Sequence, residues 1–348
     1  MALVVWVIDA AIRNFMVPRP TRVRLTRWIA SAVGRVFDAL APPSRAYATR
    51  DRILALRPPL ILLAYQATWM LLVFVGFTGI FWGLSQPGWR VASQESGSAL
   101  FTLGFASPAG TAPLLAVYAE ALIGLTLLAL LISYLPTIYG AFQRREAMVA
   151  KLSVRGSFPG SDPSPWHSLA VSHAAGVLEI MESTMWPEWE NWFIDVGESH
   201  RSLPVLNWYR SPDPGSHWIS AARTVLDMGA LRVSTVDLPS SVAPNVTIRS
   251  GVITLQALAR FLAFPFDPDP APDAPISVTR AQYEAACDYL VEAGVPVVAD
   301  RDQGWAAFAG WRVNYDTIIE AAAEVLAAPP SPWLSVIGSR PGVNPNEA

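Results

Sequence analysis

The chain has 348 residues, of which 52% are hydrophobic and 15% are charged, and its mean hydropathy is +0.32. This composition is too apolar for an ordinary soluble domain, so it predicts a membrane protein. The single cysteine, Cys287, excludes an internal disulfide framework and a cysteine-based zinc site, and its place in a helical pattern indicates plain packing.

The net charge of −3 hides an uneven distribution. Residues 1–58 carry ten arginines and three aspartates, a balance of +7, and residues 143–160 carry four basic residues and one glutamate, a balance of +3. From residue 161 onward there are 22 acidic residues and ten arginines, a balance of −12. The acidic C-terminal part argues against nucleic acid as a partner.

The N-terminal region, residues 1–58, is predicted to form cytoplasmic and interfacial amphipathic helices. Its apolar start resembles a signal-peptide core, but Asp9 interrupts it and no basic region or cleavage site flanks it, so we reject a signal peptide. Residues 21–40 place apolar side chains on one helical face and arginines largely elsewhere. Such a helix suits an anionic lipid surface, and packing on the protein's own cytosolic part is an equal alternative.

Two apolar runs predict transmembrane helices at residues 59–84 and 112–142. The first has no charged residue and the second has only Glu120, and each is longer than the roughly 20 residues that cross a bilayer. The intervening residues 85–111 carry only Arg90 and Glu95, whereas the flanking segments are basic. The positive-inside rule therefore places both termini in the cytoplasm, at the plasma (inner) membrane, and the loop outside.

After the second span, residues 143–164 are predicted to form a basic helix extension and then a linker rich in Gly, Pro and Ser. A helical cytosolic regulatory domain is expected at residues 165–335 and a disordered tail at 336–348. Thr279 and Gln282 have the spacing of a capping box, and residues 295–300 are the best strand candidate. The expected helices of this domain cover residues 166–185, 188–200, 216–232, 247–264, a helix through 292 that either Ser277 or Thr279 caps, and 302–327.

The loop between the spans carries the strongest functional signal. Residues 96–101 allow about two helical turns, which suit a half-helix that dips into the membrane. Backbone at membrane depth must line a protein cavity, where its carbonyl groups can replace the water shell of a cation. The alternative is an ordinary extracellular loop. The extended segment that follows the half-helix consists of Thr102, Leu103, Gly104, Phe105 and Ala106.

This segment resembles the filter of the two-transmembrane, pore-loop potassium channels, in which a Thr-x-Gly-Tyr/Phe-Gly motif follows a pore helix. Thr102 to Phe105 match that pattern, whereas Ala106 stands where the family has glycine and Ser107 where it usually has Asp. The chain also resembles bacterial potassium-channel-like membrane proteins with a helical cytosolic tail. Those matches are Tyr134-Leu135-Pro136, Ile138-Tyr139, Ala141-Phe142, Arg145-Glu146, Glu198-Ser199-His200, Arg210-Ser211, Ser216, Trp218 and Leu226-Asp227.

The resemblance implies an all-α membrane protein with two transmembrane helices, a re-entrant pore helix and an α-helical cytosolic C-terminal domain. It implies a homotetrameric channel for a monovalent cation of the potassium type, without a cofactor. In such filters glycines allow alternate residues to adopt left-handed backbone angles, where a Cβ costs about 1–2 kcal/mol per residue. Ala106 therefore predicts a filter that is shorter or wider at its outer mouth, or a pore that has lost conduction.

Several residues of the second span have predicted roles. Glu120 is expected either to bond donors behind the filter or to pack in protonated form against a neighbouring helix. Gly124 predicts close helix approach or a bend, and Pro136 predicts a bend near the cytoplasmic exit because it removes a helical hydrogen bond. Three further side chains are candidates for a gate that closes by dewetting: Leu128, Ile132 and Leu135.

The cytosolic part offers few chemical motifs. His200 with Glu198 and either His167 or His173 could in principle hold a metal, but no typical ligand spacing is present, so we predict no metal site. No phosphate loop, nucleophile motif or paired catalytic carboxylates are visible in the sequence, so we predict no enzyme. Helical spacing favours a core or interface role over a ligand box for Trp186, Trp189 and Trp192.

Two functions remain open at this point. The first is a homotetrameric cation channel that contacts membrane lipid and whose cytosolic domain responds to a small ligand or a protein. The second is a non-conducting, membrane-anchored sensor or scaffold with a degenerate channel fold, whose acidic tail binds a protein partner.

Overall fold

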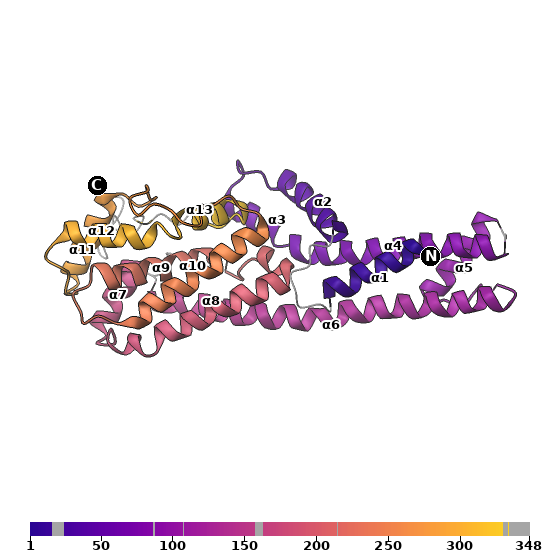
Figure 1. Cartoon of the computed structure of the whole chain (residues 1–348), viewed down its shortest axis with the longest axis horizontal. Helices are drawn as coiled ribbons and strands as arrows, with labels where there is room; N and C mark the ends of the chain where they lie inside the picture. Colours follow the sequence, from indigo (N-terminus) through magenta and orange to yellow (C-terminus); the bar gives the residue numbers. More distant parts are fainter. Residues whose placement is uncertain are drawn as a thin grey trace. The chain divides into compact units, whose positions relative to one another are not determined.

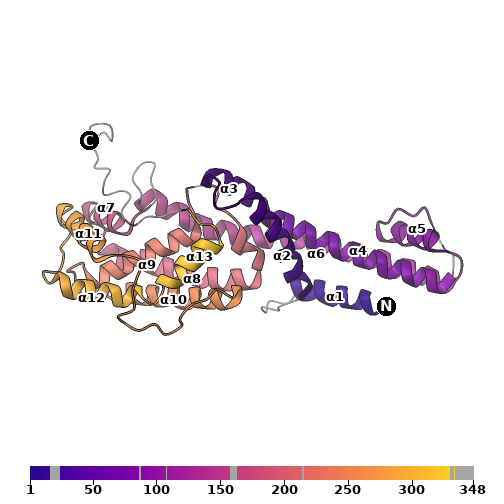
Figure 2. The same ribbon diagram turned by 90° about the horizontal axis from the view of Figure 1, so that it is seen from above.

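The regular structure of this chain is helical, as Figures 1 and 2 show. Within the described residues, strand-like pairing is limited to one isolated bridge between Val236 and Val297. The chain divides into two compact units, Met1–Ala141 and Phe142–Ala348. The computed structural model describes residues 1–15, 24–85, 88–106, 108–156, 163–213, 215–329 and Trp333.

The first unit is built around two long apolar helices, α4 (Arg57–Ser85) and α6 (Thr111–Gly156). The helical segments Tyr47–Ser85 and Thr111–Gly156 are both long and apolar enough to cross a membrane, and they contain the two predicted spans. The shorter α5 (Trp89–Leu100) packs on α4 and lies beside the ends of both long helices (Figure 1).

The apolar N-terminal segment forms α1 (Ala2–Phe15), which packs along α4. Gly76 permits this approach, because a Cβ at that position would lie 2.7 Å from Val4 Cγ2. Val4 and Val7 share one apolar core with Trp69 and Val73 of α4. One face of the segment that resembles a signal-peptide core is therefore buried on the first membrane-length helix, while Val5, Trp6 and Ile12 are exposed.

The amphipathic segment predicted at residues 21–40 forms α2 (Arg24–Leu40), and residues 21–23 lie outside the described residues. Its apolar face is divided between two environments. Leu25 and Phe37 are buried, whereas three other apolar side chains are exposed: Trp28, Val36 and Leu40. The short α3 (Tyr47–Leu54) follows, and Arg57 at the start of α4 forms an ion pair of 3.6 Å with Asp38 of α2.

The second unit packs its helices around α9 (Trp218–Ser234), whose residues are almost all buried. This helix contacts α7, α10, α12 and α13, and α8 packs closely against α10. The other elements of the unit are α7 (Pro165–Ala174), η1 (Ile180–Glu182), α8 (Met185–Ser202), η2 (Pro204–Trp208), α10 (Val242–Leu262), α11 (Arg280–Glu292), α12 (Arg301–Arg312) and α13 (Asp316–Val325).

One helix in this part of the chain ends earlier than predicted. Helix α6 continues past Phe142 to Gly156, as the predicted basic helix extension requires, because residues 143–155 contain neither Gly nor Pro and are mostly good helix formers. The helix predicted at residues 166–185 ends early, since Gly176 takes a left-handed φ of 66° that terminates α7. Residues 157–162 of the predicted linker and 334–348 of the predicted tail lie outside the described residues.

The last helix, predicted at residues 302–327, is in fact two helices, α12 and α13. The Asn314 side chain donates to the carbonyls of Gly310 (2.9 Å) and Trp311 (3.2 Å) and so satisfies the C-terminal end of α12. The strand predicted at residues 295–300 is also wrong, because the segment pairs only with the short stretch that follows α9. The capping box of Thr279 and Gln282 is confirmed at the start of α11.

Candidate functional site

The segment after α5 turns back on the end of that helix. The amides of Thr102 and Leu103 donate to the carbonyls of Ala99 (3.0 Å) and Ser98 (2.9 Å). Thr102 and Gly104 both have left-handed backbone angles, with φ of 54° and 72°. Glycine adopts such angles without a steric cost, whereas at Thr102 the cost is about 1–2 kcal/mol. Two residues of this segment, Thr102 and Gly104, therefore have left-handed backbone angles two positions apart.

The hydroxyl of Ser98, which sequence analysis did not single out, holds the far end of the segment. Ser98 Oγ accepts a hydrogen bond from the Ala106 amide (3.0 Å) and lies 3.3 Å from the Ala106 carbonyl oxygen as a donor. One side chain of α5 thus fixes both backbone groups of Ala106. The side chains of Leu103 and Phe105 are 64% and 66% exposed in the single chain.

Glu120 connects α6 to the same short helix. The Ser96 hydroxyl donates to Glu120 Oε1 at 2.5 Å and also lies 3.1 Å from the Phe74 carbonyl oxygen of α4. Both Ser96 and Glu120 are fully buried. Three helices therefore meet at Ser96, and Glu120 accepts a hydrogen bond from a donor on α5.

Gly124 lies one helical turn after Glu120 and provides a second contact with α5. A Cβ at Gly124 would lie 2.5 Å from the Leu100 carbonyl oxygen and 3.0 Å from Leu100 Cδ1. Only glycine allows α6 to approach the last residue of α5 this closely. Gly124 therefore serves close helix approach, the first of its two predicted roles.

The remaining candidates of the second span lie farther along α6. Its buried face includes Gly124, Leu127 and Leu131. The predicted gate residues lie along the edge of this face, where Leu128 and Ile132 are exposed and Leu135 is half-buried. Pro136 is exposed and lies within an uninterrupted helix.

Within the second unit, the C-terminal part of α6 contacts η2 and α8 through the buried Arg145. Its guanidinium donates to the carbonyls of Leu206 (3.0 Å) and Tyr209 (2.8 Å) and pairs with Glu146 at 2.7 Å. Arg145 Nη1 also lies 3.0 Å from Nε2 of His200. Burial and the Arg145 charge hold the pKa of His200 well below its usual value, so the imidazole is neutral and can accept this hydrogen bond.

The residues weighed as metal ligands do not come together. His200 Nε2 is hydrogen-bonded to Arg145, and His167 Nδ1 is hydrogen-bonded to the Tyr289 hydroxyl at 2.8 Å. Glu198 forms a surface ion pair with Arg201. Within the described part of the chain, no three His, Cys, Asp or Glu side chains form a group that could hold a metal ion. The tryptophans at 186, 189 and 192 are buried in the core of the second unit.

A second buried charge network stabilises the same unit. Asp227 of α9 accepts from Arg312, from the Tyr315 hydroxyl at 2.8 Å and from Trp333 Nε1 at 3.0 Å. Its carboxylate is therefore compensated on several sides, as a buried charge requires. This arrangement joins α9 to the C-terminal helices and leaves no group of the network open for chemistry.

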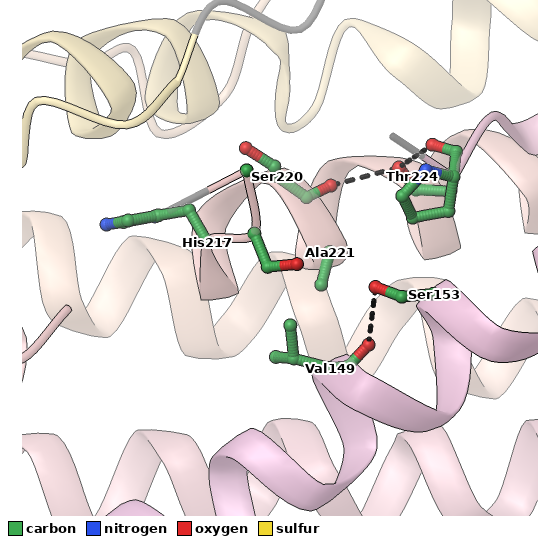
Figure 3. Close-up of a pocket in the computed structure, with 9 residues that line it drawn as sticks. Val149, Ser153, His217, Ser220, Ala221 and Thr224 are labelled. Atoms are coloured by element: carbon green, nitrogen blue, oxygen red, sulfur yellow. Dashed lines mark hydrogen bonds between the residues drawn. The ribbon is translucent and has the colours of Figure 1, made fainter. Parts of the chain in front are cut away.

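A small pocket lies between the end of α6 and α9 (Figure 3). Val149 and Ser153 of α6 face Ser220, Ala221 and Thr224, and the hydroxyls of Ser153 and Thr224 donate to the carbonyls of Val149 and Ser220. The space holds about one water molecule. It is too small for an organic ligand.

Comparison of the chain with models of known protein families, with curated proteins and with solved structures finds no match. The geometry of α5 and α6 therefore carries the functional argument.

Proposed function

We propose that the chain is one subunit of a homotetrameric cation channel of the potassium type, with residues 102–106 as its filter. The observation that carries the proposal is the turn after α5, which has left-handed angles at Thr102 and Gly104 and is held between two membrane-length helices. In this proposal α5 is a re-entrant pore helix, and both termini lie in the cytoplasm of a cell bounded by a plasma (inner) membrane.

Symmetry follows from the physics of the proposed site. One turn cannot surround a cation, and backbone at membrane depth must not face lipid, so copies have to meet around an axis. The C-terminal end of α5 carries the negative pole of a helix dipole, which favours a cation between the copies. The exposure of Leu103 and Phe105 in the single chain supports contact with such neighbours.

The hydrogen bonds of Ala106 indicate how this filter differs from the potassium-channel pattern. The Ser98 hydroxyl donates to the Ala106 carbonyl at 3.3 Å, which occupies one of the two lone pairs of this oxygen and competes with coordination of a cation. We infer that carbonyl sites end before Ala106 and that the filter is short at its outer mouth. Weaker discrimination between K⁺ and Na⁺ is the expected consequence.

Gating would use the continuous α6. In the proposed pore, Leu128, Ile132 and Leu135 form the hydrophobic constriction, and Pro136 weakens the helix near its cytoplasmic exit. Because Arg145 ties the same helix to η2 and α8, a ligand or protein that shifts the cytosolic unit would shift α6. The exposed apolar face of α2 supports contact of this helix with membrane lipid.

Potassium flux from liposomes containing the purified protein tests the proposal. Wild type should release K⁺, and Gly104→Val should not, because Gly104 has a φ of 72° that a β-branched residue adopts only with strain. Chemical cross-linking of both samples checks that they assemble equally. Absence of flux in a wild-type protein that cross-links to tetramers would overturn the proposal.

The second candidate is a non-conducting, membrane-anchored sensor or scaffold. The specific observation in its favour is the engaged carbonyl of Ala106 at the position where the potassium-channel pattern has glycine. A protein of this class would form the same oligomer without flux. A blocking cation such as Ba²⁺ would then have no effect on any measured property.

A further inference from the structure

An open cavity of about 450 Å³ lies at the cytosolic end of α6, away from the proposed filter. The last two turns of α6 form one side of it, and α7, the segment around η1, the start of α8 and Met228 of α9 form the rest. This volume falls within the range of ligand pockets, about 300–1,000 Å³. All of the lining residues belong to the second unit.

Most of the cavity wall is apolar and adaptable. Three methionines contribute, Met181, Met185 and Met228, and Trp189 adds a rigid buried ring. Methionine side chains adjust their shape easily and are common at surfaces that bind flexible apolar ligands. At the same cavity four aliphatic side chains are exposed: Val154, Val171, Val177 and Ile180. Water is a poor solvent for this group of side chains, so an apolar occupant would be stabilised.

The charged groups at the cavity are basic. Lys151 and Arg155 line it, whereas no acidic side chain is part of its described lining. Lys151 pairs with Glu188, but Arg155 is exposed and forms no salt bridge with any described residue. The N-terminal turn of α8 also lines the cavity at Met185. The N-terminus of a helix is the positive end of its dipole, which favours an anion.

We propose that this cavity binds a fatty-acid-like ligand, with a single carboxylate paired to Arg155 and an alkyl chain along the methionines. The basic group, the apolar wall and the volume together fit a medium-chain carboxylate. Because α6 continues from the cavity into the membrane-length segment, occupancy would also change gating, and this last clause rests on the proposed channel function.

Photo-cross-linking of the full-length protein in nanodiscs tests the binding site. The probe is a decanoic acid that carries a diazirine at its chain end, and mass spectrometry locates the adducts. We expect adducts within residues 171–189 and at Met228, competed by unlabelled decanoate but not by decylamine or acetate. Equal competition by decylamine, or adducts confined to the membrane-length helices, would overturn the assignment.

Two variants with a matched control sharpen the experiment. Ala175→Trp fills the cavity from an exposed position and should abolish these adducts, whereas Ile253→Trp, on the exposed surface of α10, should retain them. Arg155→Gln should weaken decanoate competition about tenfold, because a charge-assisted hydrogen bond is lost. Unchanged adducts in Ala175→Trp would count against the site.

Potassium flux with and without decanoate then tests separately whether the ligand changes gating. A change in wild-type flux that is absent in Arg155→Gln supports this effect. Adducts without any change in flux overturn the effect on gating and leave the binding site in place. If the protein passes no potassium under any condition, the cross-linking result still decides whether the ligand site exists.

Discussion

The contact between Gly124 and Leu100 gives the sharpest test of how the proposed filter is held. In Gly124→Ala the new Cβ would lie 2.5 Å from the Leu100 carbonyl oxygen, well inside normal contact distance. This oxygen is a backbone atom and cannot rotate away, so α5 must move. Overpacking costs about 1–3 kcal/mol, and alanine regains about 1 kcal/mol of helix propensity. The net destabilisation is therefore about 0–2 kcal/mol per subunit, and the displaced α5 rather than the stability alone should reduce the flux.

Gly79→Ala in α4 is the matched control, since no atom lies within 4 Å of a Cβ placed there. Potassium flux from liposomes and a denaturant melt of both variants provide the measurements. Gly124→Ala should lose most of its flux and unfold at lower denaturant, while Gly79→Ala should match wild type or be slightly more stable. The reasoning is refuted if the two variants conduct and unfold alike.

Three further predictions concern other contacts. Ala106→Gly should raise the ratio of K⁺ to Na⁺ permeability, and an unchanged ratio would contradict the inference that the filter is short. Arg145→Met leaves the carbonyls of Leu206 and Tyr209 without their donor, so the second unit should lose about 3–5 kcal/mol of stability in a thermal melt; an unaltered melt would show that this contact does not anchor α6. Burial and nearby arginines hold the pKa of His200 and His217 well below the usual 6.5, so the unfolded chain takes up protons that the folded chain does not. Stability should therefore fall below about pH 6.5, by about 1.4 kcal/mol per pH unit for each histidine, and a flat profile between pH 7 and 5.5 would exclude this linkage.

Features that depend on composition along the chain were predictable. The absence of charge between Pro59 and Leu84 indicated a membrane-length helix, and α4 covers that run. The capping box at Thr279 could also be read directly, because its two partners are three residues apart and both bonds are local. In both cases the residues that determine the structure are neighbours in the sequence.

Features that depend on long-range contacts were not predictable. Ser96 was predicted only as the first residue of a half-helix, and its hydrogen bond to Glu120, 24 residues later, has no signal in the local sequence. Arg145 looked like part of the exposed basic flank of a span, yet it is buried against His200, 55 residues away. The role of Ser98 was not predictable because its partner is the backbone of Ala106, and no pattern of side chains in the sequence indicates such a contact.

The break between α12 and α13 illustrates a local effect that was missed. Asn314 lies in an otherwise helical pattern without Gly or Pro between residues 311 and 327, so the pattern predicted one continuous helix. Its amide group bonds the preceding carbonyls and ends the helix instead. Short polar side chains can therefore override an apolar periodicity.

Potassium efflux from liposomes that contain the purified full-length protein tests the central claim most directly. The account predicts efflux that depends on the protein and is lost in Gly104→Val with the tetramer intact. A wild-type tetramer that leaves the potassium gradient unchanged contradicts it.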